Sequence, residues 1–498
     1  MKNLFTFYYI GSTIYLLRII NQIIFKTVMK NKVLWLFIIN FVIFSNRLFA
    51  ININENNTND KSKQELTLVD VLEIALKNNP KVKESWLNID SAKYSYRSEL
   101  SNYLPTVKGE LSYDNSRNKY NDKNTPTTKS DYLTPSISLS YLLFDFGGRE
   151  ADVLNFKYKL NAVKYESSSF MQNFIYQVTE AYYNLFSSLA NKKASIESEN
   201  SSHEAFKAAT IRYDLGLVPL TDKLQAETSY IQKKLAREKA ENTVKIKQAN
   251  LNYLLNLSPN SEIDLKIPLM NIPDDSFDEN VANLIGIAIQ NRPDLKSYYE
   301  TKKAKKAEVW SNANDWLPTV SLNASYGERN DRINDINRTN YNIGVNASMP
   351  FFTGGYIYNN VAKSRSELKI MNEKINDLEK DIELDVWTAY QNFITAKRTY
   401  ITSETLLKNA IETEKTMLGR YKNGKASILD LLNTQTDLAT ARYEFINSQH
   451  NWFINKANLI RAIGSMSVEE LKTLTIAYSS NNININNGNQ DEIKNKIN

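Results

Sequence analysis

The feature that most restricts how this chain can fold is an internal duplication. The segment Arg212–Leu224 (RYDLGLVPLTDKL) and the segment Arg420–Leu432 (RYKNGKASILDLL) share Arg-Tyr, Gly, Asp and Leu at the same spacing, 208 positions apart. Each copy joins two long stretches of helical periodicity, so each is predicted to be the tip of an αα-hairpin. The fold must therefore build the same supersecondary unit twice.

Other signatures recur in the same order. A proline follows a short helix at Asn79-Pro80 and again at Arg292-Pro293. A Leu-Pro-Thr-Val strand entry occurs at 104–107 and at 317–320, and a Gly-Gly ending closes the strand pair at 144–148 and at 350–355. From these matches we assign repeat 1 to residues 66–257, a proline-containing linker to 258–280 and repeat 2 to 281–464.

Both ends of the chain lie outside the repeats. Residues 1–50 contain two apolar runs and no acidic residue, and the second run has the build of a secretory signal peptide that starts at Met29 and ends in Leu48-Phe49-Ala50. We expect residues 1–50 to be a leader, with Met29 as a candidate start and an uncleaved anchor as the alternative. Residues 51–65 are predicted to be a polar leader. Residues 465–498 comprise a segment that only the resemblance to a known family implies to be equatorial, followed by an Asn-rich tail predicted to be disordered.

Period-two alternation of apolar and polar side chains predicts two strands in each repeat, at residues 107–114, 136–143, 320–326 and 343–349, with a polar loop over 115–131. The polar faces carry mainly Ser, Asn, Lys and Glu, which suits a water-filled lumen better than a protein core. After Ala50 no apolar run approaches the roughly 20 residues of a spanning helix. A membrane crossing would need a closed β-barrel, and four strands are too few to close one, so several protomers would have to contribute.

Helical periodicity accounts for the rest of each repeat. In repeat 1 it covers 66–103 with a break at Pro80, then runs unbroken from Arg149 to Leu215 for about 100 Å, and after the Gly216 turn continues for about 58 Å. The helix over 81–103 is about 35 Å long, so its length and the roughly 58 Å of the helix after the turn together nearly equal the length of the long helix. The two shorter helices are therefore expected to lie end to end beside the long one.

Composition excludes several classes of function. All six charged residues of the first 50 are basic, so the net charge of +6 falls to about zero without them, and a nucleic-acid footprint has little support. With no Cys and only His203 and His450, which we expect on solvated helix faces, no cofactor, metal site or catalytic group is indicated. The segment Gly419–Lys425 approaches a P-loop but is followed by Ala426 and preceded by no strand. We do not expect an enzyme.

Taken in order, the duplication, the strand entries, the Gly-Gly endings and the two tips resemble the TolC-like outer-membrane efflux protein family, the outer membrane factors, over residues 66–470. The resemblance implies an α+β membrane protein with four β-strands per chain in a trimeric, 12-stranded outer-membrane β-barrel. A long α-helical periplasmic barrel of coiled-coil hairpins would continue it. The protein would be the passive exit duct of a tripartite efflux or type I secretion system, in outer-membrane lipid and extending into the periplasm, with a periplasmic adaptor (membrane fusion) protein and an inner-membrane pump or ABC transporter as partners.

The same resemblance assigns roles at the tips. Asp430 would line a ring of carboxylates with a raised pKa at the constriction, and Asn433 stands at the family's second ring position. Tyr421 would donate a hydrogen bond to Asp222 across the tips, whereas Ala426 replaces an Arg of the family's latch. The segments expected to dock the adaptor are Leu215-Gly216-Leu217 and Asn423-Gly424-Lys425.

A periplasmic coiled-coil adaptor or scaffold is the alternative interpretation. It predicts one hairpin and a compact β module, whereas this sequence predicts two tips and four amphipathic strands. The sequence does not identify the transported substrate, because the resemblance implies that the partner pump selects it.

Overall fold

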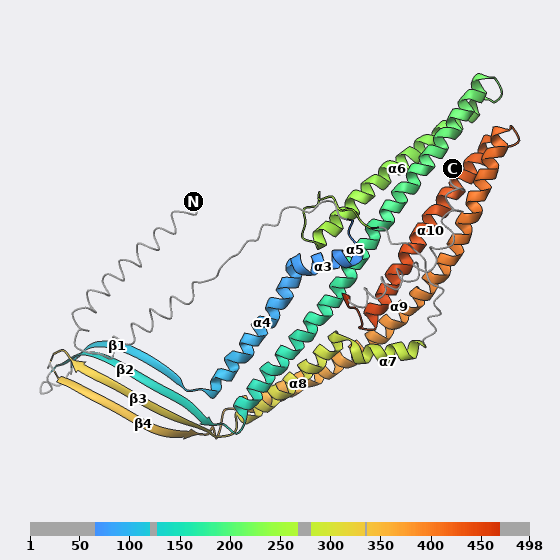
Figure 1. The fold of residues 1–498 in the computed structure, drawn as a ribbon. Coiled ribbons are helices and arrows are strands. Elements are labelled where there is room, and N and C mark those ends of the chain that lie inside the picture. Colours follow the sequence, from blue (N-terminus) through green and yellow to red (C-terminus); the bar gives the residue numbers. More distant parts are fainter. Residues whose placement is uncertain (1–64, 120–126, 267–279, 334–335, 469–498) are drawn as a thin grey trace, which may run out of the picture. The chain divides into compact units, whose positions relative to one another are not determined.

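The computed structural model describes residues 65–119, 127–266, 280–333 and 336–468. The predictions for residues 1–50, and most of those for the polar leader, the linker and the C-terminal tail, concern residues outside these ranges. Within them, each repeat consists of two short helices, two strands and a helical hairpin (Figure 1). None of the described helices is both long enough and apolar enough to span a bilayer.

The elements follow the predicted order. Repeat 1 contains α3 (Leu68–Asn78), α4 (Pro80–Leu100), the 3₁₀ turn η1 (Ser101–Tyr103), β1 (Thr106–Asn118), β2 (Thr128–Phe144), α5 (Gly148–Asp214) and α6 (Leu220–Leu254). Repeat 2 contains α7 (Val281–Asn291), α8 (Pro293–Asn314), β3 (Thr319–Asp331), β4 (Ile336–Ser348), α9 (Tyr356–Lys422) and α10 (Ile428–Ala462).

Local sequence signals set the helix boundaries. α3 starts at a capping box in which Thr67 and Asp70 bond each other's backbone N–H groups. α4 starts with Pro80 directly after the N-cap Asn79, where the N–H that proline lacks would have no helical partner. The long helices α5 and α9 begin after Gly147 and Gly355, whose φ angles of 93° and 85° suit glycine.

The four strands form one antiparallel sheet in the order β1-β2-β3-β4. The sheet is longer than predicted, because residues 115–118 and 128–131, expected in a loop, extend β1 and β2 in register. These residues are almost all polar, so no period-two signal marks them. Backbone pairing between the two strands stabilises them nevertheless, and the Ser116 and Ser130 hydroxyls lie 2.7 Å apart.

The shorter helices of repeat 1 pack along the single long helix. α4 and α6 both pack on α5, which has 67 residues and is about 100 Å long. The Asn79 side chain at the start of α4 donates from Nδ2 to the Leu254 carbonyl at the end of α6, at 2.8 Å. The prediction that these helices lie end to end is confirmed. An apolar core fills the junction, formed by Val71, Leu72, Ala75, Val178, Tyr182, Leu185, Leu251 and Leu255.

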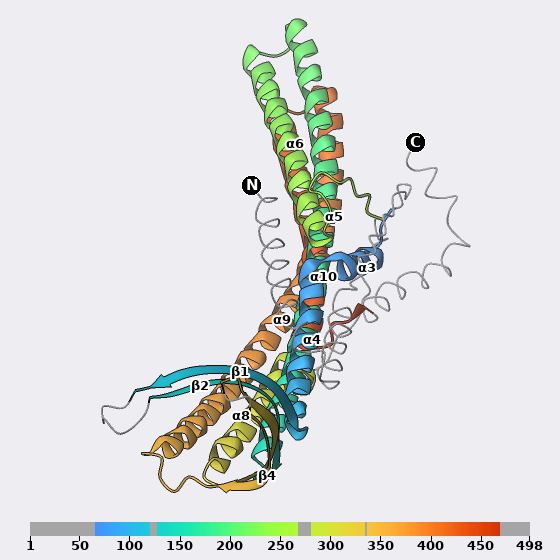
Figure 2. The same ribbon diagram turned by 90° about the vertical axis from the view of Figure 1, so that its left-hand side faces the viewer.

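Repeat 2 packs by the same plan, with α8 and α10 against α9. The repeats meet because α8 and α10 also pack on α5 (Figure 2). Polar contacts join α5 to α8, since Asn155 donates to the Ala304 carbonyl at 3.2 Å and Asn161 donates to Glu300 at 3.0 Å. The helix α5 therefore links the two hairpins, α5/α6 and α9/α10.

Candidate functional site

Both hairpins end in the same turn. The N–H of Leu217 bonds the Arg212 carbonyl and the N–H of Lys425 bonds the Arg420 carbonyl, both at 2.8 Å, as in a Schellman motif. Gly216 and Gly424 adopt φ angles of 71° and 72°, a conformation that residues with a Cβ rarely adopt. The turn itself therefore explains why both tips carry glycine.

The residues expected to dock an adaptor lie at the surface of both tips. Leu215 and Leu217 are 68% and 64% exposed, although leucine is usually buried. Asn423, Gly424 and Lys425 are exposed at the second tip. The first tip thus presents apolar side chains and the second tip presents polar ones.

Asp430 lies in the first turn of α10 and is exposed. Its carboxylate accepts hydrogen bonds from the Ser427 hydroxyl at 2.8 Å and from the Ser427 N–H at 3.2 Å, which completes a capping box. These bonds favour the ionised form and hold the pKa of Asp430 below its usual range. The predicted rise in pKa concerns a ring of carboxylates from several chains, and it stays a prediction. Asn433 is exposed, one turn further along α10.

The ends of the two hairpins share a small apolar core. Its buried members come from all four helices and are Ala205, Ala209, Ala226, Tyr421, Ile428, Leu431 and Leu432. Alanines on α5 and α6 leave room for larger side chains of α9 and α10. The structure thus brings the two predicted tips together.

Tyr421 is 1% exposed, and its hydroxyl makes no hydrogen bond with any described residue. The predicted hydrogen bond to Asp222 is therefore not formed, because the tyrosine ring lies within the apolar core between the hairpins. Burial raises the pKa of Tyr421, the charge of Arg212 lowers it and the charge of Asp222 raises it.

Arg212 connects the tips, and the sequence analysis did not assign it a role. Its Nη1 donates to the Tyr421 carbonyl at 2.9 Å, and its guanidinium carbon lies 5.0 Å from the centre of the Tyr421 ring. We call this pair of interactions the tip contact. The repeated Arg-Tyr dipeptide is a sequence signal for the tip contact. It occurs in both tips, however, and does not reveal that the Arg of the first tip contacts the Tyr of the second tip.

Both histidines lie at helix packing surfaces and are half-buried, so their expected place on solvated faces is wrong. His203 stacks on Tyr230 with ring centres 4.7 Å apart. His450 lines a groove of about 570 Å³ between α5, α6 and α10, where its Nε2 lies 3.1 Å from Asn184 Oδ1. Burial lowers the pKa of His450. A lone histidine carried no sequence signal for either place.

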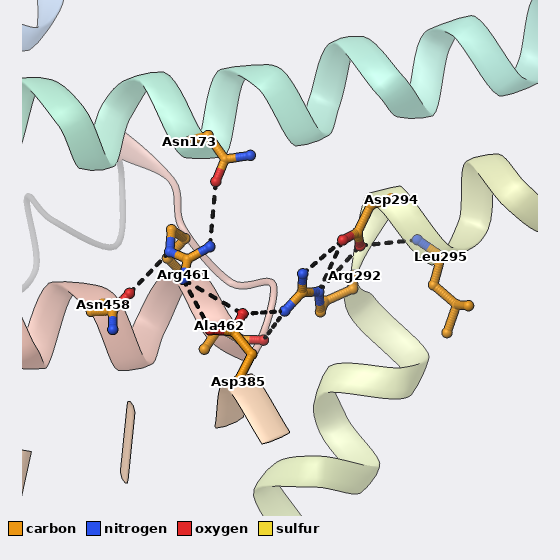
Figure 3. Close-up of polar contacts among 8 residues, drawn as sticks. All are labelled: Asn173, Arg292, Asp294, Leu295, Asp385, Asn458, Arg461 and Ala462. Carbon is orange, nitrogen blue, oxygen red and sulfur yellow. Dashed lines mark hydrogen bonds and ion pairs between the residues drawn. The ribbon is translucent and has the colours of Figure 1, made fainter. Parts of the chain in front are cut away.

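Away from the tips, a cluster of charged side chains lies where α7 meets α8 (Figure 3). Asp385 of α9 binds two arginines, Arg292 at 2.7 Å and Arg461 at 3.2 Å, and Arg292 also binds Asp294 at 2.7 Å. Burial by itself would lower the pKa of Arg292, but the hydrogen bonds and charges of the two carboxylates raise it. The sequence gives no signal for this cluster, because its members are far apart in the chain and differ between the repeats.

Comparisons with known proteins agree with this architecture. The profile of the family described as "Outer membrane efflux protein" matches residues 71–257 and 284–465. The chain is 22% identical over 437 residues to the outer membrane protein TolC of Escherichia coli K12, covering 83% of this chain and 85% of that protein. It is 24% identical over 427 residues to the outer membrane efflux protein BepC of Brucella suis, covering 83% of this chain and 88% of that protein.

Solved structures show the same fold. The Campylobacter jejuni CmeC outer membrane channel aligns with a TM-score of 0.73 at 19% identity, over 85% of this chain and 97% of that chain. The outer membrane protein VceC of Vibrio cholerae aligns with a TM-score of 0.70 at 19% identity, over 80% of this chain and 96% of that chain.

Proposed function

This chain belongs to the outer membrane efflux protein family, and we propose that it is the passive exit duct of a tripartite efflux or type I secretion system, gated where its two hairpin tips meet. Like its relatives it is an outer-membrane protein that extends into the periplasm. The duct itself performs no chemistry, so its function consists in forming a path and in opening it.

The observation that carries the proposal is the shared apolar core and the tip contact between the hairpins. Both lie at the far end of α5 from the sheet, about 100 Å away along the helix. A duct with a single closable end requires a sheet at one end and a packed contact between the tips at the other. Opening would then separate the α9/α10 tip from the α5/α6 tip.

Several copies of the chain are needed to close the duct, and we propose three. Only four strands are present in the described sheet, and its edges are β1 and β4. Four strands of each of three chains would close a wall of twelve. An apolar stripe on α6 is also about half exposed in the single chain and would be covered by a neighbouring copy; its members are Leu220, Leu224, Ile231 and Leu235.

The exposed tips are the proposed docking sites for a periplasmic adaptor, which would join the duct to an inner-membrane pump or an ABC transporter. The names of two relatives describe export and efflux: the chain is 25% identical to the toxin and drug export protein A of Aggregatibacter actinomycetemcomitans and 24% identical to the outer membrane efflux protein BepC. The alternative function, an adaptor or scaffold, is disfavoured by the family match across both repeats.

Reconstitution of the full-length protein tests the proposal. A duct should require detergent for extraction, migrate as a trimer on native gels and produce ion channels in planar bilayers. An adaptor would dissolve without detergent, or remain on a single anchor, and would give no channels. The second result would rule out the duct.

Site-specific photo-crosslinking in cells tests the docking sites. A photoreactive residue at Leu217 or Lys425 is expected to capture one periplasmic protein. The control position is Trp86 of α4, which is exposed at a distance from both tips along the chain. Equal capture at Trp86 and at the tips would contradict docking at the tips.

A further inference from the structure

The two repeats form the same joint with different chemistry. In repeat 1 the N-cap residue of α4, Asn79, donates to the Leu254 carbonyl at the end of α6, at 2.8 Å. At the equivalent positions of repeat 2, Arg292 before α8 donates from Nη1 to the Ala462 carbonyl at the end of α10, at 3.4 Å. Each hairpin therefore has its returning helix fastened to the start of a shorter helix.

The joint of repeat 2 is ionic. One carboxylate, Asp385, accepts from both Arg292 and Arg461, and Arg292 is held on its other side by Asp294 (Figure 3). We call these four residues the ionic joint. The duplication places other residues at the corresponding positions of repeat 1, namely Asn79, Lys81, Gln177 and Tyr253. No carboxylate stands among them, so the first joint cannot copy the second.

The ionic joint and the adjacent end of α10 also contact α5 of the first repeat. Gln172 of α5 donates to the Gly464 carbonyl at 2.9 Å, and Arg461 Nη1 lies 3.5 Å from Asn173 Oδ1. Gly464 has a φ of 75°, and a Cβ there would lie 2.9 Å from the Arg292 backbone. The end of α10 therefore approaches Arg292 as closely as a glycine permits, which leaves little slack between the joint and α5.

We propose that Asp385 is a positioning residue, which sets the angle at which the α9/α10 hairpin leaves the ionic joint and so decides whether the second tip rests against the first. The consequence for gating rests on the proposed function, but the positional claim does not. Asp385 touches neither tip and acts through Arg292 and Arg461.

The geometry gives this joint leverage. α10 has 35 residues, so its tip end lies about 50 Å from the joint. A rotation of about 5° at the joint moves that end by about 4 Å. A shift of this size would break the 2.9 Å hydrogen bond of the tip contact. A small change at the joint is thus sufficient to part the tips.

Charge explains why one carboxylate has this effect. The Arg292 side chain is only 14% exposed, so its guanidinium depends on protein anions in place of water. Without the charge of Asp385, Arg292 keeps Asp294, but Arg461 loses its carboxylate and the two cations repel each other. The joint then widens, whereas the joint of repeat 1, which contains no carboxylate, is unaffected.

Amide hydrogen exchange of the full-length protein in detergent tests the proposal without relying on channel activity. Asp385→Asn should speed exchange several-fold at the second tip, residues 418–432, and to a smaller extent at the first tip, residues 210–224, which loses its partner in the shared core but keeps its own joint. The matched control is Gln177→Asn, which places the same side chain at the equivalent position of α5 and should change neither tip. Faster exchange confined to the neighbourhood of residues 292, 385 and 461 would mean a purely local role and would overturn the proposal.

A second variant guards against misfolding of the first. Arg461→Gln keeps the pair of Asp385 with Arg292, so it should fold and should speed exchange at the second tip less than Asp385→Asn does. If Asp385→Asn does not fold, this variant decides alone, and unchanged exchange at the second tip refutes the positioning role. In the wild type, a rise from about 0.05 M to about 0.5 M NaCl should also speed exchange there, because salt screens the exposed part of the pairs. In Asp385→Asn salt should no longer speed exchange there, because it screens the repulsion between Arg292 and Arg461 instead.

Discussion

Arg212 Nη1, in the last turn of α5, donates a hydrogen bond of 2.9 Å to the Tyr421 carbonyl in the last turn of α9. The same guanidinium faces the Tyr421 ring at 5.0 Å. The two residues belong to different repeats, so this contact fastens one hairpin tip to the other. Arg212 thus brings a cation from the first tip to the second tip, and its Nη2 lies 3.8 Å from where a Cβ on Gly424 would be.

Tyr421→Phe is expected to be nearly silent. The tyrosine hydroxyl is buried and has no partner among the described residues, so its removal costs little and relieves an unpaired polar group. We expect the melting temperature and the channel conductance to stay at the wild-type values. Tyr421→Ala, in contrast, leaves a cavity in the shared tip core and should lower the free energy of unfolding by about 3 kcal/mol or more.

Thermal melting followed by circular dichroism, together with bilayer recordings, checks both variants. A strong gain of conductance in Tyr421→Phe would show that the hydroxyl holds the gate through a bond that this conformation lacks.

Asp430→Ala should fray the start of α10. The carboxylate caps the helix through Ser427, and its pKa is lowered by those bonds. A carboxylate whose folded pKa lies below its unfolded value stabilises above the unfolded pKa, about 3.9, and this contribution disappears as the pH falls through the folded pKa. The cap is therefore complete at neutral pH.

Exchange rates of the first-turn amides of α10 measure this effect, with Asp437→Ala on the exposed face of the same helix as control. We expect faster exchange in Asp430→Ala at pH 7 and no change in Asp437→Ala. Equal rates in the wild type and Asp430→Ala would mean that the capping box does not stabilise the helix start.

Leu224→Asp should prevent assembly while leaving the chain folded. Leu224 lies in the α6 stripe that is half exposed in the single chain, so a charge there is tolerated until another copy covers it. Light scattering in detergent should give a monomer for Leu224→Asp and a trimer for the wild type. Gln225→Asp introduces the same charge at an exposed polar neighbour and should remain trimeric. Trimers of Leu224→Asp would place the subunit interface elsewhere.

Much of this fold could be predicted from the sequence, because long periodic patterns are repeated in it. The break at Pro80, the long helices on either side of Gly216 and the four strands all carry local signals. The extensions of β1 and β2 over residues 115–118 and 128–131 do not, since backbone pairing stabilises a segment whose side chains are polar on both faces.

The site was harder to predict than the fold. The duplication located both tips, but it draws attention to what the copies share, whereas Arg212 and Asp385 matter through contacts that one repeat makes and the other does not. The Tyr421–Asp222 bond and the raised pKa of Asp430 were expected from a resemblance. The bond is not formed, because the ring of Tyr421 is buried in the tip core. The raised pKa of a carboxylate ring stays a prediction, and within one chain Asp430 acts as a helix cap.

Single-channel conductance in planar bilayers, compared among the wild type, Arg212→Ala and Arg420→Ala, tests most directly whether this protein is a duct closed at its tips. Arg420 is the repeat equivalent of Arg212 and serves as the control. The wild type should give small, mostly closed channels, and Arg212→Ala should raise their conductance several-fold, because the lost hydrogen bond and ring contact contribute about 1–3 kcal/mol to closure. Arg420→Ala should resemble the wild type. Channels of equal conductance in all three proteins, or no channels at all, would contradict a duct gated at the contact of Arg212 with Tyr421.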